Sequence, residues 1–278
     1  MIGATTFIGI AFMFIGGFVL PLGVCIGWLA VKKEKITTVL VGALVWFLFA
    51  MILEKIPAVI LLSNLTPIGK ALSANTFAFV TIGVLLAGIF EETGRFLAFK
   101  TVLKKRRNRE TSVSYGIGHG GVEAMLIVGL SAIQVLIYAL MINSGSFQTV
   151  IDQAAATGAD VSALEALPDQ IRSVTAFTAL LTILERISAM TAHVAFSIIV
   201  FYGVRESKIG YYFLAVLLHA LYDVPAGLYQ KGLVDVYVVE AVLFVASVIL
   251  LVTTLLLVYN KMTAEKAADK IPEEASAS

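Results

Sequence analysis

The sequence predicts an all-α protein, a polytopic bundle of transmembrane helices. Of its 278 residues, 59% are hydrophobic and only 14% are charged, and the mean hydropathy is +0.93. Soluble globular domains carry about a quarter charged residues. The chain also divides into long apolar segments separated by short polar ones, which predicts a single transmembrane domain over residues 1–260.

Seven segments are long enough to span a bilayer. Crossing the hydrocarbon as a helix takes about 20 apolar residues, because backbone groups cannot stay unpaired in lipid. The segments are roughly 5–31, 36–60, 75–101, 113–142, 174–204, 209–229 and 233–260. Pro57 could split off a short extra helix after the second span, which would make eight. Polar residues fill 143–172 and the tail 261–278.

The basic residues predict the orientation. The clusters "KKEK" (32–35), "KKRRNRE" (104–110) and "RESK" (205–208) follow spans one, three and five, and three lysines of the tail follow span seven. The alternate connections are poor in basic residues. Because basic residues near membrane ends mark the cytoplasmic side, we expect the N-terminus outside, 143–172 as an extracytoplasmic loop and 261–278 as a cytoplasmic tail.

Two further properties exclude classes of partner and bond. The net charge of +1 argues against nucleic acid, since binding phosphates takes an excess of basic surface. The one cysteine, Cys25, allows no disulfide within the chain. The lipid bilayer itself is the partner that the composition predicts.

Ionisable residues inside the spans are the main functional signal. Charged groups at membrane depth cost several kcal/mol each and usually face a bundle interior or a water cavity. They are Glu91, Glu92 and Arg95 in span three, His119 and Glu123 in span four, Glu185, Arg186 and His193 in span five, and His219 and Asp223 in span six. Pairs such as His119/Glu123 and His219/Asp223 are four residues apart and share a helix face.

These residues are predicted to lie at one level. Counted from the cytoplasmic ends of their spans, Glu91 and the three histidines lie roughly 9 to 17 Å deep. Polar groups in a membrane can simply hold helices together, with hydrogen bonds of around 1 kcal/mol each. Adhesion does not require every histidine of the chain at one depth beside several carboxylates, so a working site is favoured. The glycines of "GIGHGG" (116–121) are better explained by close helix packing.

Imidazoles and carboxylates in a partly dry chamber suit two kinds of chemistry. In metal-free hydrolysis, Glu or His takes a proton from the attacking water while other groups stabilise the oxyanion. In a zinc site, neutral imidazoles and carboxylates bind the metal and leave one position for water. The chain has no HExxH motif, so a zinc site would take ligands from several helices.

Three motifs, on spans three, four and six, carry a family resemblance. "EETGR", "GIGHGGVEA" and "HALYDVP" resemble the YhfC family of intramembrane metalloproteases over about residues 80–230. That family is similar to the group of CAAX prenyl endopeptidases and bacteriocin-processing enzymes, with PrsW proteases and the gamma-secretase scaffold subunit as further relatives. The resemblance implies a protease core over helices 75–230, in a bacterial or archaeal plasma membrane.

The resemblance also suggests roles for single residues. Glu91 and Glu92 match a Glu-Glu-xxx-Arg motif, although Arg95 comes one residue early, and we favour Glu91 as the base because Arg95 follows it by four residues. His119, with Tyr115 four residues before it, would activate water together with Glu91. His219 would hold the oxyanion, and Asp223 would orient His219 or bind a metal.

Glu123 and His193 fall outside the wider group's pattern. With His119 and His219 they make up the predicted metal-binding set, with zinc as the expected metal, while a metal-free mechanism stays open. The favoured function is an endopeptidase that cleaves membrane-embedded or membrane-associated proteins or peptides. The alternatives are a non-catalytic scaffold or substrate-binding subunit and a proton-coupled transporter.

Overall fold

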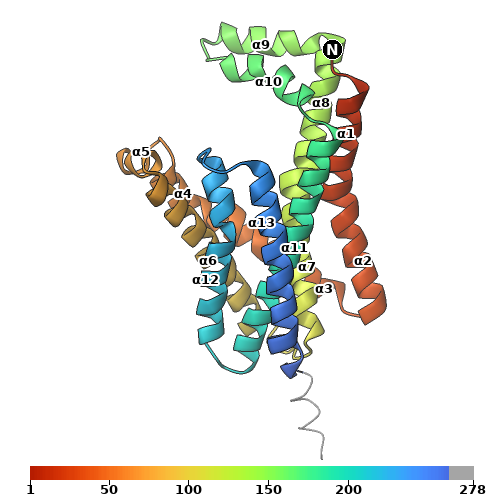
Figure 1. Ribbon diagram of the computed structural model, residues 1–278, viewed down its shortest axis with the longest axis vertical. Helices are drawn as coiled ribbons and strands as arrows, with labels where there is room; N and C mark the ends of the chain where they lie inside the picture. Colours follow the sequence, from red (N-terminus) through yellow and green to blue (C-terminus); the bar gives the residue numbers. More distant parts are fainter. Residues whose placement is uncertain (263–278) are drawn as a thin grey trace, which may run out of the picture. The chain divides into compact units, whose positions relative to one another are not determined.

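The computed structural model describes residues 1–262, and helices make up nearly all of this part of the chain (Figure 1). There is no strand in residues 1–262, which confirms the all-α class. Seven helical segments are long and apolar enough to cross a membrane: Ala4–Lys32, Ile36–Leu62, Thr76–Lys100, Glu110–Ser144, Ala176–Arg205, Gly210–Gln230 and Val236–Tyr259. The predicted spans agree with these to within a few residues. The tail from residue 263 onward lies outside the described residues, and the orientation stays a prediction.

Pro57 does not start a further span. It lies in the first turn of α4 (Lys55–Leu62), within the continuous helical segment Ile36–Leu62. α4 continues the second span after α3 (Ile36–Trp46) and the π-helix η2 (Phe47–Leu53). The short helix α5 (Pro67–Ala74) follows it and ends before the third span.

Polar side chains fix several helix starts. Thr66 accepts a hydrogen bond from the Gly69 N–H at the start of α5, at 2.9 Å. Asn75 accepts one from the Ala78 N–H, also at 2.9 Å, at the start of α6 (Thr76–Lys100). Asp235 accepts one from the Tyr237 N–H at the start of α13 (Val236–Thr254). These caps satisfy backbone donors that a helix start leaves free.

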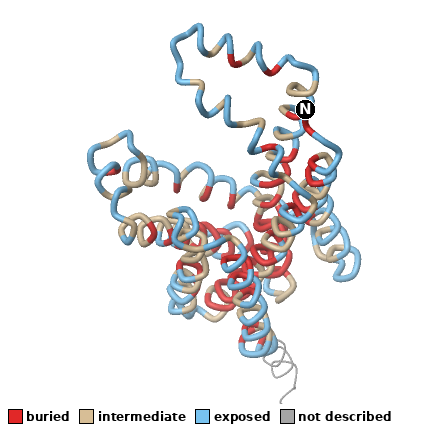
Figure 2. Tube along the Cα trace, turned by 45° about the horizontal axis from the view of Figure 1, so that its top comes forward, coloured by how far each residue is buried: buried red, intermediate tan, exposed pale blue. Residues whose placement is uncertain are grey.

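The chain forms two compact units. The first comprises Met1–Gly23 and Glu123–Ile187. Its helical segments are α1 (Ala4–Phe14), η1 (Ile15–Val19), the start of α2 (Leu20–Lys32), η3 (Met125–Gly129), α8 (Leu130–Ser144), α9 (Ser146–Ala156), α10 (Ser162–Arg172) and the first part of α11 (Ala176–Arg205). Its core joins Ile2 and Ile10 to Ala139 and Ile171. The predicted loop 143–172 thus contains two helices, which are largely exposed (Figure 2).

The second unit comprises Val24–Val122 and the described residues from Ser188 onward. Besides α3, η2, α4, α5, α6 and α13 it contains α7 (Glu110–Ala124, as far as Val122), α12 (Gly210–Gln230) and η4 (Leu255–Tyr259). α12 packs closely along α6, where Gly88 would place an added Cβ 2.8 Å from the Val216 carbonyl oxygen. The part of α11 from Ser188 to Gly203 is almost entirely buried. In the most apolar window of α11, 72% of the residues are buried, against at most 33% in the other six spans.

The glycines of α7 allow close helix packing, as predicted. A Cβ on Gly118 would lie 2.0 Å from the Val39 carbonyl oxygen of α3, and one on Gly116 would lie 2.6 Å from the Cα of Val194 of α11. A Cβ on Gly120 would lie 3.0 Å from the Cα of Met190, also on α11. α7 therefore packs with its backbone against the backbones of both neighbours.

The basic loop after α6 ties helix ends together, besides its predicted role in orientation. Arg106 donates hydrogen bonds to the hydroxyls of Thr37, at 2.6 Å, and Thr38 at the start of α3. Arg107 donates to the Arg205 carbonyl oxygen at the end of α11, at 2.9 Å. These bonds hold the ends of α3, α6 and α11 in one place.

We predict that Gly118→Ala destabilises the protein by about 1–3 kcal/mol or more, because the added methyl group would overlap backbone atoms that no side-chain rotation can move. Thermal unfolding in a mild detergent would measure the loss. Gly23→Ala is the matched control, since nothing lies within 4 Å of its added Cβ. An unchanged midpoint for Gly118→Ala would contradict the close α3–α7 packing.

Candidate active site

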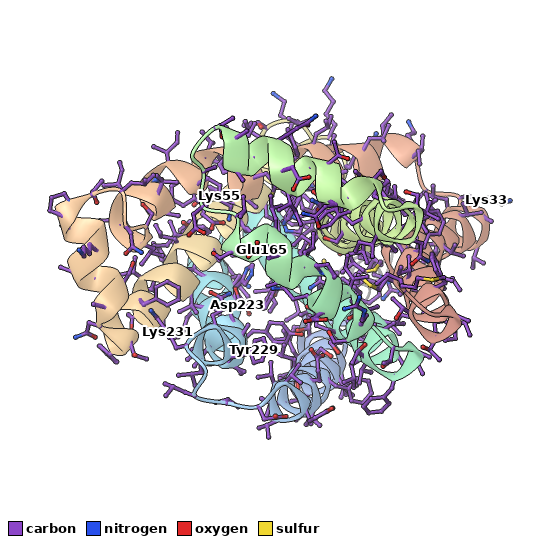
Figure 3. The ribbon with its side chains drawn as sticks, turned by 90° about the horizontal axis from the view of Figure 1, so that it is seen from above. Lys33, Lys55, Glu165, Asp223, Tyr229 and Lys231 are labelled. Atoms are coloured by element: carbon purple, nitrogen blue, oxygen red, sulfur yellow. The ribbon has the colours of Figure 1, made fainter. Side chains whose placement is uncertain are left out.

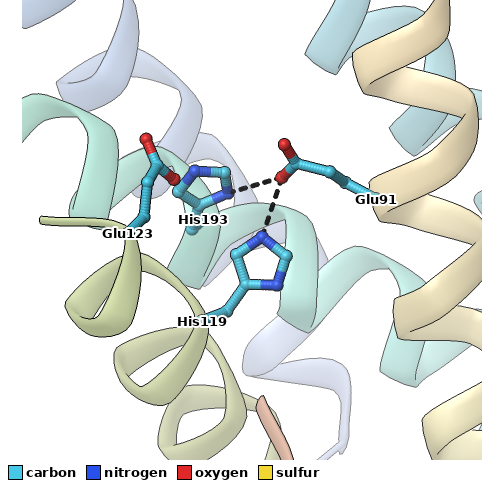
Figure 4. A group of neighbouring side chains, drawn as sticks. All are labelled: Glu91, His119, Glu123 and His193. Atoms are coloured by element: carbon cyan, nitrogen blue, oxygen red, sulfur yellow. Dashed lines mark hydrogen bonds and ion pairs between the residues drawn. The ribbon is translucent and has the colours of Figure 1, made fainter. Parts of the chain in front are cut away.

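One carboxylate oxygen of Glu91 faces all three histidines of the chain. Glu91 Oε2 lies 2.8 Å from Nε2 of His119, 4.0 Å from Nδ1 of His193 and 3.9 Å from Nε2 of His219. Figure 4 shows the first two of these contacts. The four side chains come from α6, α7, α11 and α12 and are all buried. The predicted convergence of spans three to six is therefore found.

Close packing of α7 against α11 brings two of the histidines together. The rings of His119 and His193 lie 4.5 Å apart, between the Gly116 and Gly120 contacts with α11. Tyr115, one turn before His119, is fully buried, and its ring centroid lies 6.0 Å from that of His119. Larger residues in place of these glycines would push the helices apart and separate the imidazoles.

Glu92 and Arg95 form a second polar group beside the first. Glu92 Oε1 accepts a hydrogen bond from Arg95 and lies 2.7 Å from Nδ1 of His219. Both side chains are completely buried. The expectation that Arg95 belongs with Glu91 needs correction, because its ion pair is with Glu92, three residues earlier. Positions three and four apart both share a helix face, so spacing alone does not separate the two glutamates.

Arg95 also orients His193. Its terminal nitrogen lies 3.3 Å from Nδ1 of His193. A guanidinium can only donate hydrogen bonds, so Nδ1 acts as the acceptor and is the unprotonated nitrogen. The same Nδ1 lies on the Glu91 side of the ring.

Asp223 lies at the border of the buried group. Its Oδ2 is 3.5 Å from Nε2 of His219, one turn earlier on α12, and its side chain is about a third exposed. Figure 3 shows Asp223 on α12, with Tyr229 and Lys231 toward the end of that helix. The His219 ring also stacks on the ring of Phe196, with centroids 4.7 Å apart.

Four of these residues could hold a metal ion. Glu91, His119, Glu123 and His193 each offer a ligand atom, and these atoms lie within 4.8 Å of one another (Figure 4). Glu123 follows His119 by one turn of the same helix. The group contains Glu91 in place of His219, which belonged to the predicted metal-binding set.

The donor set fits zinc. Two imidazoles and two carboxylates are ligands that zinc accepts, at about 2.0–2.2 Å, which places ligand atoms of a tetrahedral site roughly 3.3 Å apart. The ligand atoms here lie between 2.8 and 4.8 Å from one another, so small side-chain rotations would bring them to the spacing of a zinc site. The poorest feature is His119 Nδ1, which is buried and has no hydrogen-bond partner within residues 1–262. Metal-binding histidines usually donate this second N–H.

Sequence reasoning gave Arg186 no role, yet Arg186 contacts a member of this group. It donates a hydrogen bond to Glu123 Oε1 at 3.1 Å and also pairs with Glu185 beside it. Arg186 is the one basic residue besides His193 in the interior of the fifth span, which is a signal that could have marked it. The Glu123 carboxylate thus has a cationic partner that a bound metal would have to share.

The comparisons with known proteins agree with this site. Residues 17–244 match the family model described as YhfC intramembrane metalloprotease. The chain is 34% identical over 218 residues to "Uncharacterized membrane protein YhfC" of Bacillus subtilis (strain 168), covering 78% of this chain and 83% of that protein. No solved structure matches. The matched region includes every residue of the buried group, and the chain belongs to the YhfC intramembrane metalloprotease family.

Proposed function

We propose that this integral membrane protein is an endopeptidase of a bacterial or archaeal plasma membrane, which hydrolyses peptide bonds of membrane-embedded or membrane-associated proteins. The observation that carries the proposal is the position of Glu91, with one oxygen facing three imidazoles from three other spans. Helix adhesion needs only pairs of polar groups. A buried carboxylate that faces several imidazoles is an arrangement suited to general acid–base chemistry.

Glu91 is the proposed general base. His119 donates its Nε2–H to Glu91 Oε2 and fixes that oxygen. The 3.9 and 4.0 Å gaps to His219 and His193 are too long for direct hydrogen bonds, but a water can contact Glu91 and a ring nitrogen at once. Glu91 takes a proton from this water while the water oxygen bonds to the carbonyl carbon of the scissile peptide. The proton then passes to the leaving amine when the C–N bond breaks.

His219 is the proposed group that stabilises the oxyanion. Glu92 accepts a hydrogen bond from the Nδ1–H of His219 and fixes the ring, and Arg95 donates a hydrogen bond to Glu92. When His219 is doubly protonated, its Nε2–H is free to donate to a developing oxyanion, and Asp223 borders the same nitrogen. Glu92, Arg95 and Asp223 thus serve as positioning residues.

A metal is compatible with this assignment. Three residues of the group Glu91, His119, Glu123 and His193 would hold it and leave one position for water. With His119, Glu123 and His193 as the ligands, Glu91 stays free to act as the base. A bound zinc ion would polarise the carbonyl and lower the pKa of a bound water. His219 keeps its role in either case, since it is outside this group.

We predict that Glu91→Gln and His119→Gln each reduce proteolysis by about 10²–10⁴-fold, the usual contribution of acid–base catalysis. The purified protein would be reconstituted into liposomes with total membrane protein, and new protein N-termini would be counted by mass spectrometry. Glu54→Gln is the matched control, because Glu54 is a buried glutamate that pairs with Lys55 away from the histidines. If cleavage by both site variants equals that of the wild type, the proposal is wrong.

Metal binding gives a second prediction, with a readout that does not require a substrate. We expect about one zinc per wild-type chain by elemental analysis, and a higher unfolding midpoint with zinc, because a ligand that binds the folded state stabilises it. His193→Ala should lose both effects, whereas His219→Ala should keep them, since only His193 belongs to the ligand group. Zinc binding that is absent in the wild type, or unaffected by His193→Ala, would leave the metal-free mechanism.

A further inference from the structure

A long groove opens on the surface of the second unit, beside α12, the helix that carries His219. Its volume is about 700 Å³. It lies between α12 and α13 and has the buried α11 as its floor. The lining residues that matter here are Leu214, Leu221, Ala246, Ile249, Leu257 and Lys261. We propose that this groove binds one anionic phospholipid, with an acyl chain between α12 and α13 and the headgroup at Lys261.

The length of the groove matches one leaflet of a bilayer. Ala246 and Lys261 mark its extent along α13 and η4, and fifteen residues of helix measure about 22 Å. Half of a hydrocarbon core of about 30 Å, plus part of the headgroup region, gives a similar length. A lipid that lies along the groove would therefore fit with its head at one end and its chain ending near the bilayer centre.

One end of the groove is apolar and the other carries a positive charge, which matches the acyl chain and the headgroup of an anionic lipid. Leu221 and Ile249, toward the deep end, are apolar and more than half exposed, at 58% and 60%. Lys261 lies at the other end, is exposed, and forms no ion pair or hydrogen bond with the part of the chain that the structure describes. An exposed ammonium at the membrane surface attracts an anionic headgroup.

A second lysine lies near the same end. Tyr211 lines the groove on the α12 side, opposite the end of α13. Its backbone N–H donates to the Lys208 carbonyl oxygen at 3.2 Å, so the two residues share one tight turn. The Lys208 ammonium donates to the Tyr202 hydroxyl at 3.4 Å and Lys208 does not line the groove, so Lys261 is the cation that favours an anionic over a zwitterionic headgroup.

Peptide occupants fit less well. An α-helix with its side chains is about 10 Å wide. A groove of about 700 Å³ that extends over about 22 Å is narrower than this. An extended peptide would be narrow enough. Its backbone N–H and C=O groups would remain unpaired against the leucine and isoleucine walls, at a cost of several kcal/mol per group.

The test is native mass spectrometry of the delipidated full chain, titrated with phosphatidylglycerol or with phosphatidylcholine of the same acyl chains. We expect one phosphatidylglycerol to bind at least about fivefold more tightly than phosphatidylcholine. Lys261→Gln should remove this preference and leave phosphatidylcholine binding unchanged. Ala246→Phe, which fills the deep end, should weaken both lipids, and Lys70→Gln is the control for an exposed lysine elsewhere.

Three outcomes would overturn the proposal: equal affinity for both lipids in the wild type, an unchanged preference in Lys261→Gln, or displacement of the lipid by an equal concentration of glycerol phosphate. The last result would show a phosphate site without a chain site. Because Lys261 is exposed, its substitution does not threaten folding, and equal unfolding midpoints would confirm this. No substrate is used, so the result does not depend on the proposed protease activity.

Discussion

The structure depends on mutual compensation of charges that are buried at membrane depth. A lone carboxylate or guanidinium in hydrocarbon is costly, and none of the site's charged groups is alone. Glu92 and Arg95 are completely buried and pair with each other, and Glu91 has imidazoles on three sides. Removing one member would leave its partner uncompensated, so the four helices are bound to one arrangement. The proposed role of Glu91 as a general base depends on the same arrangement.

This constraint explains why small residues surround the site. Imidazole side chains are short, so the helix backbones have to approach closely before His119 and His193 can touch. The backbone contacts at Gly116 and Gly118 provide that approach on two sides of α7. Glycine weakens an isolated helix by roughly 1 kcal/mol relative to alanine. In α7 the glycines allow the close approach that forms the buried polar contacts. Helix packing and site geometry are therefore one feature of α7.

The sequence was sufficient for the helical fold and for the convergence of Glu91 with the three histidines, and less so for the pairings around them. Hydropathy locates all seven spans because a bilayer sets one length for each of them. Counting residues from the span ends brought Glu91 and the histidines to one level, and the structure places them together. Periodicity did not assign Arg95 to Glu92, because spacings of three and four residues both share a face. Neither the contact of Arg186 with Glu123 nor the groove along α13 follows from periodicity, since both depend on how neighbouring helices are rotated.

The most direct test of this account uses the fact that the chain has only three histidines. Nitrogen NMR of the histidine-labelled protein in lipid would report on each imidazole before and after Glu91→Gln, with Glu54→Gln as the control. The account predicts that Glu91→Gln changes the signals of all three histidines, because one carboxylate faces each of them, and that the control changes none. A change confined to one imidazole, or no change, would contradict the convergence of the four helices on Glu91.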